Sequence, residues 1–273
     1  MIRGQLSLWG LLRETFSPSP RAPAPTPPKP AIAKPAPKRP TEETTTETIH
    51  LPHGSAEVEW RRSARARRVS LRIDPRGGAI IVTLPGRASR KAGLALLMDN
   101  AGWVAERLAA LPGAIPFADG ATIPLHGIDR VIRHTGTPGP ARLEGDTLLV
   151  GGDPAFLPRR VGDFLRAEAR RELAALAMQK AALAGLRPRR VSLKDTKSRW
   201  GSCAADRSLA FSWRLVMAPR HVQDYVAAHE VAHLRHMNHG RDFWALVGTL
   251  TPHQEAAMAW LRDQGPALLR IGQ

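Results

Sequence analysis

The sequence predicts an α+β protein: a β-rich N-terminal part that contains one helix, followed by a part in which a small sheet packs on a helix. Runs rich in β-branched residues, separated by Gly and Pro, alternate with segments of three-to-four apolar spacing. The chain has 273 residues and is 43% hydrophobic, which is enough for a core. A helical segment after Pro219 combines apolar residues with two histidines and a glutamate.

The N-terminal part has the composition of an extended tail. Residues 17–40 contain ten prolines, which excludes regular helix or sheet, and residues 41–48 are rich in Thr and Glu. We therefore predict a disordered tail with a Pro-rich linker over 1–48, a β-rich subdomain over 49–150 and a second subdomain over 151–273.

The β-rich subdomain begins with a predicted hairpin. Two strand-like runs, 58–73 and 79–84, flank an Asp-Pro-Arg-Gly-Gly turn signal. The first run carries six arginines, which make a surface able to contact phosphates or carboxylates. A helix over 89–111 follows. Further strands are predicted at 121–125, 130–133 and 147–150.

The second subdomain alternates helices and short strands. A long amphipathic helix is expected to stop at Gly185, and Pro219 suits the first turn of the helix that it opens. Aromatic residues in the last two helices are expected to lie in the core. The predicted elements are a helix at 158–184, a strand at 189–195, a loop at 197–203, a strand at 208–217, and helices from 219, at 241–250 and at 252–264.

The helix that follows Pro219 carries the pattern H-E-x-x-H. His229 and His233 are four residues apart, so both imidazoles project from one helical face and can bind one divalent cation. Glu230 can act as general base toward a water that such a cation activates. Apolar neighbours predict that the helix is largely buried, and a buried carboxylate needs a compensating partner.

The third metal ligand has two candidates in the sequence. His236 lies on the same helical stripe but about 10 Å along the axis from His229, which suits a tetrahedral site poorly. His239 points away if the helix continues, but Asn238 and Gly240 are residues that stop helices. We therefore favour a turn that brings His239 to the metal, with one zinc ion per chain. Manganese, cobalt and iron are the other metals considered.

The formal net charge is +16, which favours acidic partners such as nucleic acid or nucleotides, or is simply a solvated basic surface. One cysteine, Cys203, excludes an internal disulfide and fits a reducing compartment. No apolar run is long enough to span a membrane, and residues 1–16 lack the features of a signal peptide. The expected location is therefore cytoplasmic.

Four stretches of the chain together resemble the YgjP-like zinc metallopeptidase family, a relative of SprT-like proteins. They are K-S-R-W-G-S-C at 197–203, F-S-W-R-L at 211–215, H-E-V-A-H at 229–233 and N-H-G-R-D-F-W at 238–244. The resemblance covers roughly 49–261 and implies a zincin-like catalytic subdomain over 151–273. It also implies His229, His233 and His239 as zinc ligands and Glu230 as the catalytic residue. The ligand spacing equals that of metzincins, but His236 stands where those proteins have glycine.

Three functions follow as hypotheses. The first is a zinc-dependent peptidase that acts on a peptide or protein substrate. The second is metal-dependent hydrolysis of a nucleoside triphosphate with release of diphosphate, and the third is a DNA-associated protease or a nucleic-acid-binding adaptor with structural zinc. A peptide substrate could add by β-pairing to the strand just before the metal-binding helix. Substrate contacts or oxyanion stabilisation are expected from residues of the 197–203 loop and the helix: Arg199, Trp200, Gly201, Ser202, Cys203 and Tyr225.

Overall fold

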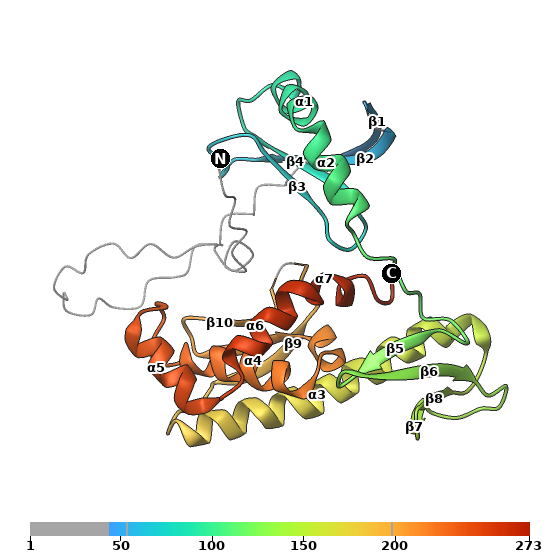
Figure 1. Ribbon diagram of the computed structural model, residues 1–273, viewed down its shortest axis with the longest axis vertical. Coiled ribbons are helices and arrows are strands. Elements are labelled where there is room, and N and C mark those ends of the chain that lie inside the picture. Colours follow the sequence, from blue (N-terminus) through green and yellow to red (C-terminus); the bar gives the residue numbers. More distant parts are fainter. Residues whose placement is uncertain (1–43, 53, 198) are drawn as a thin grey trace, which may run out of the picture. The chain divides into compact units, whose positions relative to one another are not determined.

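A computed structural model describes residues 44–52, 54–197 and 199–273 (Figure 1). The predicted tail and linker at 1–43 lie outside the described residues. The described chain is α+β, as predicted, with three mixed sheets and seven α-helices among these residues. Two compact units can be distinguished. The first holds the described residues up to Ile73 together with Ala79–Ala105, and the second holds Asp74–Gly78 and Glu106–Gln273. The sequence-based boundary at residue 150 thus falls inside the second unit.

The first unit is a four-stranded sheet of order β1-β2-β4-β3 with helix α1 packed on it. The central strands β2 and β4 are parallel, and the outer pairs are antiparallel hairpins. The predicted hairpin across Asp74–Gly78 is confirmed as β3 and β4. The elements are β1 (Thr44–Leu51), β2 (Gly54–Ser63), β3 (Ser70–Ile73), β4 (Ile80–Pro85), α1 (Arg90–Asp99) and the start of α2 (Ala101–Ala109).

Three expectations for this unit need correction. The run 58–73 is not one strand, because a turn after Ser63 separates β2 from β3. The Thr-rich stretch before residue 49 is not all irregular, since Thr44 pairs with Arg61 at the start of β1. The predicted helix over 89–111 breaks at Asn100, which caps α1 and separates it from α2.

The core of the first unit forms where β2 and β4 meet α1. Val58, Ile80 and Val82 are completely buried. Ile80 and Val82 face the same side of the sheet, since they are alternate residues of β4. Gly93 lets α1 approach closely, since a Cβ at this position would lie 2.7 Å from Trp60 Cζ3.

The second unit begins with a sheet of order β5-β6-β8-β7 that repeats the pairing pattern of the first: antiparallel, parallel, antiparallel. Strand β7 has no counterpart in the sequence prediction, which identified the other three. The strands are β5 (Thr122–Leu125), β6 (Ile128–His134), β7 (Arg142–Glu144) and β8 (Thr147–Val150).

The rest of the second unit packs three short strands and several helices around α3 (Leu157–Leu183), drawn in yellow in Figure 1. This helix confirms the predicted long helix, and it packs against both α4 and β9. The third sheet has the order β10-β11-β9. The elements around α3 are the 3-10 helix η2 (Pro154–Phe156), β9 (Arg190–Lys194), β10 (Gly201–Cys203), β11 (Ser208–Ser212), the 3-10 helix η3 (Trp213–Met217), α4 (Arg220–Ala232), α5 (Arg241–Leu250), α6 (Gln254–Asp263) and α7 (Gly265–Leu268).

The sequence prediction differs from this sheet in two places. The run 208–217 is a strand only as far as Ser212 and then forms η3, all of whose residues are buried. The stretch expected to be a loop up to Cys203 ends in the edge strand β10, because Gly201, Ser202 and Cys203 pair with β11. No helix in the described part of the chain has the length and apolar character needed to cross a membrane.

Candidate metal centre and active site

The H-E-x-x-H segment forms the C-terminal end of α4, where apolar residues bury it. His229 is 6% exposed and Glu230 is 4% exposed. Pro219 is the N-cap of α4, one position before the place predicted from the sequence. The helix ends at Ala232, so His233 occupies the C-cap, and its N–H still bonds to the carbonyl of His229. The stop therefore comes earlier than the predicted signals at Asn238 and Gly240.

The turn after α4 explains how the chain reverses with a histidine at position 236. The amides of Arg235 and His236 both bond to the carbonyl of Ala232, which tightens the end of the helix. Among the described non-glycine residues, positive φ occurs at His126 and Arg207, outside this turn. Position 236 thus adopts a backbone that does not require glycine. The carbonyl of His236 accepts a hydrogen bond of 3.0 Å from Nδ1 of His233, which leaves Nε2 of that ring as the lone-pair nitrogen.

The turn brings three imidazoles together. One nitrogen from each of His229, His233 and His239 lies within 4.8 Å of the other two. The distance between Nε2 of His229 and Nε2 of His239 is 3.3 Å. Two nitrogens bound tetrahedrally to a cation at 2.0–2.1 Å would be about 3.3 Å apart. The geometry of the three side chains therefore fits a metal ion, and the imidazole of His236 is not in the group.

Helix α5 supplies the aromatic wall behind this cluster. The ring of Phe243 lies 5.0 Å from that of His229, 4.6 Å from that of His233 and 4.7 Å from that of His239, between centroids. Phe243 is only 1% exposed, so it belongs to the core, as expected, and it also restricts the orientations of all three imidazoles. Trp244 packs on His229 and His239 at 6.0 Å and 5.9 Å.

The electrostatic environment keeps the three rings neutral. Burial lowers the pKa of His233, and it lowers the pKa of His229 far below the usual range, helped by the other two rings. Burial and the neighbouring His233 lower the pKa of His239 to about 4. Neutral imidazole is the form that binds metal, so the donors are ready near neutral pH.

Glu230 lies on the same helix and packs against β10. Burial raises the pKa of its carboxyl to about 8, and the positive charge of Arg199 opposes this effect. A Cβ on Gly201 would lie 2.5 Å from both Cγ and Oε1 of Glu230, so the strand has room for this carboxylate only because residue 201 is glycine. A basic, buried carboxylate beside three neutral imidazoles is suited to abstracting a proton from water.

A family model described as YgjP-like, metallopeptidase domain, matches residues 67–264, which is more than half of the 273-residue chain. The chain belongs to the YgjP-like family. The match covers every element of the metal centre, and the three clustered histidines are a site that could hold a metal ion. Comparisons with curated proteins and with solved structures gave no match.

The predicted substrate-contact residues of the YgjP-like domain lie at different depths. Tyr225 is buried on α4, its ring 5.9 Å from that of His229, and burial with the charge of Glu230 raises the pKa of its hydroxyl well above the usual range. Cys203 is half-buried, and burial followed by the charge of Glu230 raises the pKa of its thiol to about 11. Arg199 is exposed. The structure thus places charged or polar groups of Arg199, Cys203 and Tyr225 within electrostatic reach of Glu230.

The side chains of Trp200 and Ser202, the other two predicted substrate contacts, point away from Glu230. The carbonyl of Trp200 accepts a hydrogen bond from the amide of Ser212, and the indole of Trp200 lies beside Gly265 of α7. Ser202 alternates with Gly201 along β10 and therefore points to the opposite face of the sheet. The strand before α4, which was predicted to pair with a substrate, is β11. It lies between β10 and β9, so both of its edges are already paired and the prediction is wrong. The edge strand next to Glu230 is β10.

An ion-pair network that the sequence prediction missed anchors the loop before β10. Arg76 donates to Asp195 at 2.6 Å and to the carbonyl of Thr196 at 2.6 Å, and buried Arg214 also pairs with Asp195. Lys197 pairs with buried Asp74 at 2.6 Å. Arg76 and Asp74 of the Asp-Pro-Arg-Gly-Gly turn therefore anchor residues 195–197, which precede β10.

A second group of metal-ligand types consists of His126, Glu168 and Glu172. The amide nitrogen of Gln223 donates to the carbonyls of Val216 and Ala218, and it also lies 3.1 Å from Nδ1 of His126. An amide nitrogen cannot accept a hydrogen bond, so Nδ1 of His126 carries no proton. The ring proton is then on Nε2, which cannot coordinate a cation in that form. The glutamates also pair with Arg171 and Arg220. We assign no metal to this group.

The arginine-rich stretch of the first unit divides into paired and exposed side chains. Arg61 pairs with Glu59, and Arg62 donates to the carbonyls of Pro85, Gly86 and Ala88. Four of the six arginines identified in the sequence are exposed without an ion pair among the described residues: Arg65, Arg67, Arg68 and Arg72.

Proposed function

We propose that this YgjP-like chain is a zinc-dependent metallopeptidase that hydrolyses peptide bonds. One zinc ion would be held by His229, His233 and His239, and Glu230 would be the general base. The observation that carries the proposal is the position of Glu230: it follows the first histidine of the cluster on α4 and is almost completely buried, with a pKa raised to about 8.

The donor set supports zinc as the metal. Three neutral imidazoles, with no carboxylate among them, suit zinc better than magnesium or calcium, which prefer oxygen ligands. When bound, zinc polarises the scissile carbonyl and makes water a nucleophile near neutral pH. The hydrogen bond from His233 to the carbonyl of His236 holds that imidazole in the tautomer that presents Nε2.

Glu230 would move the protons. Its carboxylate takes a proton from the attacking water and then passes it to the leaving amine. Burial raises the pKa of this carboxyl to about 8, and the positive charge of a bound cation would lower it, so that the ionised form is available to accept the proton near neutral pH. Arg199, whose charge acts on Glu230, and Tyr225 on α4 are the side chains suited to stabilise negative charge on the carbonyl oxygen.

The edge strand β10 would bind the substrate. An extended peptide can add to the free edge of a sheet through backbone hydrogen bonds. Since Gly201 of β10 packs on Glu230, a chain paired with this strand would pass beside the general base. Backbone pairing predicts that unfolded or extended segments are cut in preference to folded helices.

The test is to measure zinc content and hydrolysis of an unfolded protein for the wild type and for Glu230→Gln. We expect one zinc per chain in both, with hydrolysis reduced about 10²–10⁴-fold in the variant, because it cannot accept the proton. Glu255→Gln, on the exposed side of α6, is the matched control and should remain fully active. Full hydrolysis by zinc-loaded Glu230→Gln would contradict the proposal.

A further inference from the structure

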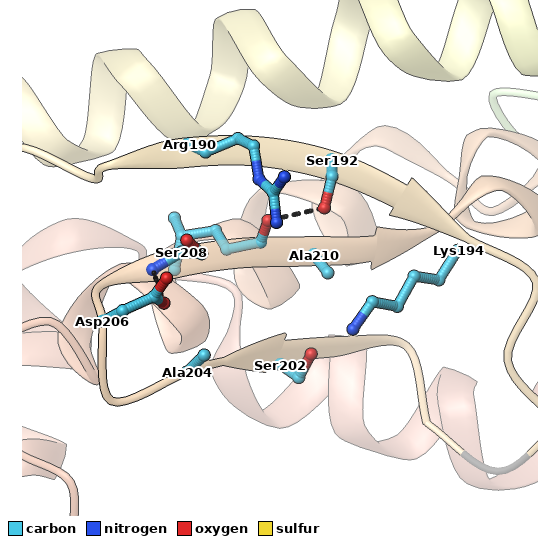
Figure 2. A pocket seen from close by; sticks show the side chains of 9 residues that line it. Arg190, Ser192, Lys194, Ser202, Ala204, Asp206, Ser208 and Ala210 are labelled. Atoms are coloured by element: carbon cyan, nitrogen blue, oxygen red, sulfur yellow. Dashed lines mark hydrogen bonds between the residues drawn. The ribbon is translucent and has the colours of Figure 1, made fainter. Parts of the chain in front are cut away.

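The sheet that contains β10 has an outer face, opposite to the face that packs on Glu230. Side chains alternate along a strand, so Gly201 and Cys203 face α4 whereas Ser202 and Ala204 face outward. This outer face forms an open hollow of about 260 Å³ (Figure 2). The hollow therefore lies on the side of the sheet opposite to Glu230.

Small side chains form the floor of the hollow. Ala210 of β11 pairs with Ser192 of β9 on one side and with Ser202 of β10 on the other, so one row across the sheet is Ser, Ala, Ser. Ser208 and Ala204 continue the floor. None of these side chains is large enough to fill the space above the strands, which leaves room for a side chain from another molecule.

Two cations border this floor. Arg190 and Lys194 lie on β9, two residues before and two after Ser192, on the same face. Figure 2 shows the side chain of Lys194 extending across β11 toward Ser202. Both side chains are exposed, and neither forms an ion pair within the ranges that the structure describes.

The one carboxylate in the lining is already balanced. The carboxylate of Asp206 accepts a hydrogen bond of 3.0 Å from the amide of Ser208 and forms an ion pair with Arg189 at 3.2 Å. The pKa of its carboxyl is lowered by hydrogen bonds from Ser208 and by the charges of Arg189 and Arg190, so it stays ionised and paired. The hollow therefore has an excess of two positive charges over a small, hydroxyl-bearing floor.

We propose that this hollow selects acidic side chains in the peptide substrate. The inference rests on the proposed peptidase function and on pairing of the substrate with β10. In such a pair, the substrate residue opposite Ser202 points to the outer face, as do the residues two positions before and after it. These side chains extend toward the hollow, where the guanidinium of Arg190 and the ammonium of Lys194 can bind Asp or Glu carboxylates. The substrate class is thus an extended segment with acidic residues at alternate positions.

The experiment measures kcat/KM of the zinc-loaded full chain on three peptides that differ only at alternate positions, which hold Glu, Gln or Lys. We expect the Glu peptide to be cleaved about threefold to tenfold faster than the Gln peptide, the effect of one or two exposed ion pairs, and the Lys peptide more slowly than either. The preference should weaken between 0.05 M and 0.5 M salt, because screening acts on exposed charges.

A charge-reversal variant separates this inference from the proposed function. Arg190→Glu/Lys194→Glu should reverse the order of the Glu and Lys peptides, whereas Arg187→Glu, which changes an exposed arginine outside the lining, should keep the wild-type order. Equal cleavage of all three peptides by the wild type, or an unchanged order in the double variant, overturns the selectivity. Failure to cleave any peptide with zinc bound instead counts against the peptidase function itself.

Discussion

The packing of Gly201 against Glu230 yields a quantitative prediction for Gly201→Ala. A Cβ at position 201 would lie 2.5 Å from Cγ and Oε1 of Glu230 and 2.7 Å from Cδ. Ordinary contacts of this kind are about 3.5–4.0 Å, so the overlap is about 1 Å. Glu230 is buried on a packed helix and cannot move away freely. We expect a loss of about 1–3 kcal/mol in the free energy of unfolding, the usual cost of overpacking.

The assay is urea unfolding combined with peptide hydrolysis. A displacement of Glu230 by about 1 Å should also lower kcat/KM by roughly 10²-fold. Gly265→Ala is the matched control, since its Cβ would meet Trp200 Cζ2 at 3.4 Å, which is an ordinary contact. It should change neither stability nor activity appreciably.

A double-mutant cycle tests whether contact with Glu230 causes the loss of stability in Gly201→Ala. Glu230→Ala removes the three atoms that the new methyl group would meet, so Gly201→Ala should be nearly neutral for stability in that background. If Gly201→Ala costs the same with and without Glu230, or costs nothing in the wild type, the close packing of β10 does not hold the side chain of Glu230 in place.

Two further predictions concern the groups around the centre. Burial alone would raise the pKa of Asp195, but the hydrogen bond from Arg76 and the charge of Arg214 lower it, so Asp195 stabilises the fold above its unfolded-state pKa of about 3.9. The side chain of Asp195 is 49% exposed, so solvent screens its ion pairs, and Asp195→Asn should cost about 0.5–1 kcal/mol at pH 7. Urea unfolding should show this difference disappear as pH falls through the lowered pKa; a constant difference would contradict the linkage. Phe243→Ala should cost about 3–5 kcal/mol and weaken zinc binding in a competition titration, whereas the exposed Phe156→Ala should do neither. Unchanged zinc affinity in Phe243→Ala would show that the aromatic wall does not orient the imidazoles.

Local sequence signals predicted the elements whose structure depends on neighbouring residues. The long helix α3 follows from its three-to-four apolar spacing, and the hairpin of β3 and β4 follows from its turn. The H-E-x-x-H pattern identified α4, and two helix-stop residues indicated that the chain would turn toward His239. These features depend on residues that are close together in the chain, so their patterns can be recognised in a single sequence.

Features set by long-range pairing could not be predicted in this way. Strand β10 has three residues and no β-branched side chain, and it is a strand because β11 offers it hydrogen bonds. The run that follows β11 has strand-like composition, yet it forms η3 in the core. The role of Arg76 was also hidden, since its partner Asp195 lies more than one hundred residues away in the chain.

The most direct test of the account compares His239→Ala with His236→Ala by elemental analysis of zinc and by hydrolysis of an unfolded protein. The structure gathers the ring of His239 with those of His229 and His233, whereas His236 contributes its backbone carbonyl, which alanine retains. We predict one zinc per chain and full hydrolysis in the wild type and in His236→Ala, and loss of both in His239→Ala. Zinc and activity retained in His239→Ala, or lost in His236→Ala, would contradict the proposed centre.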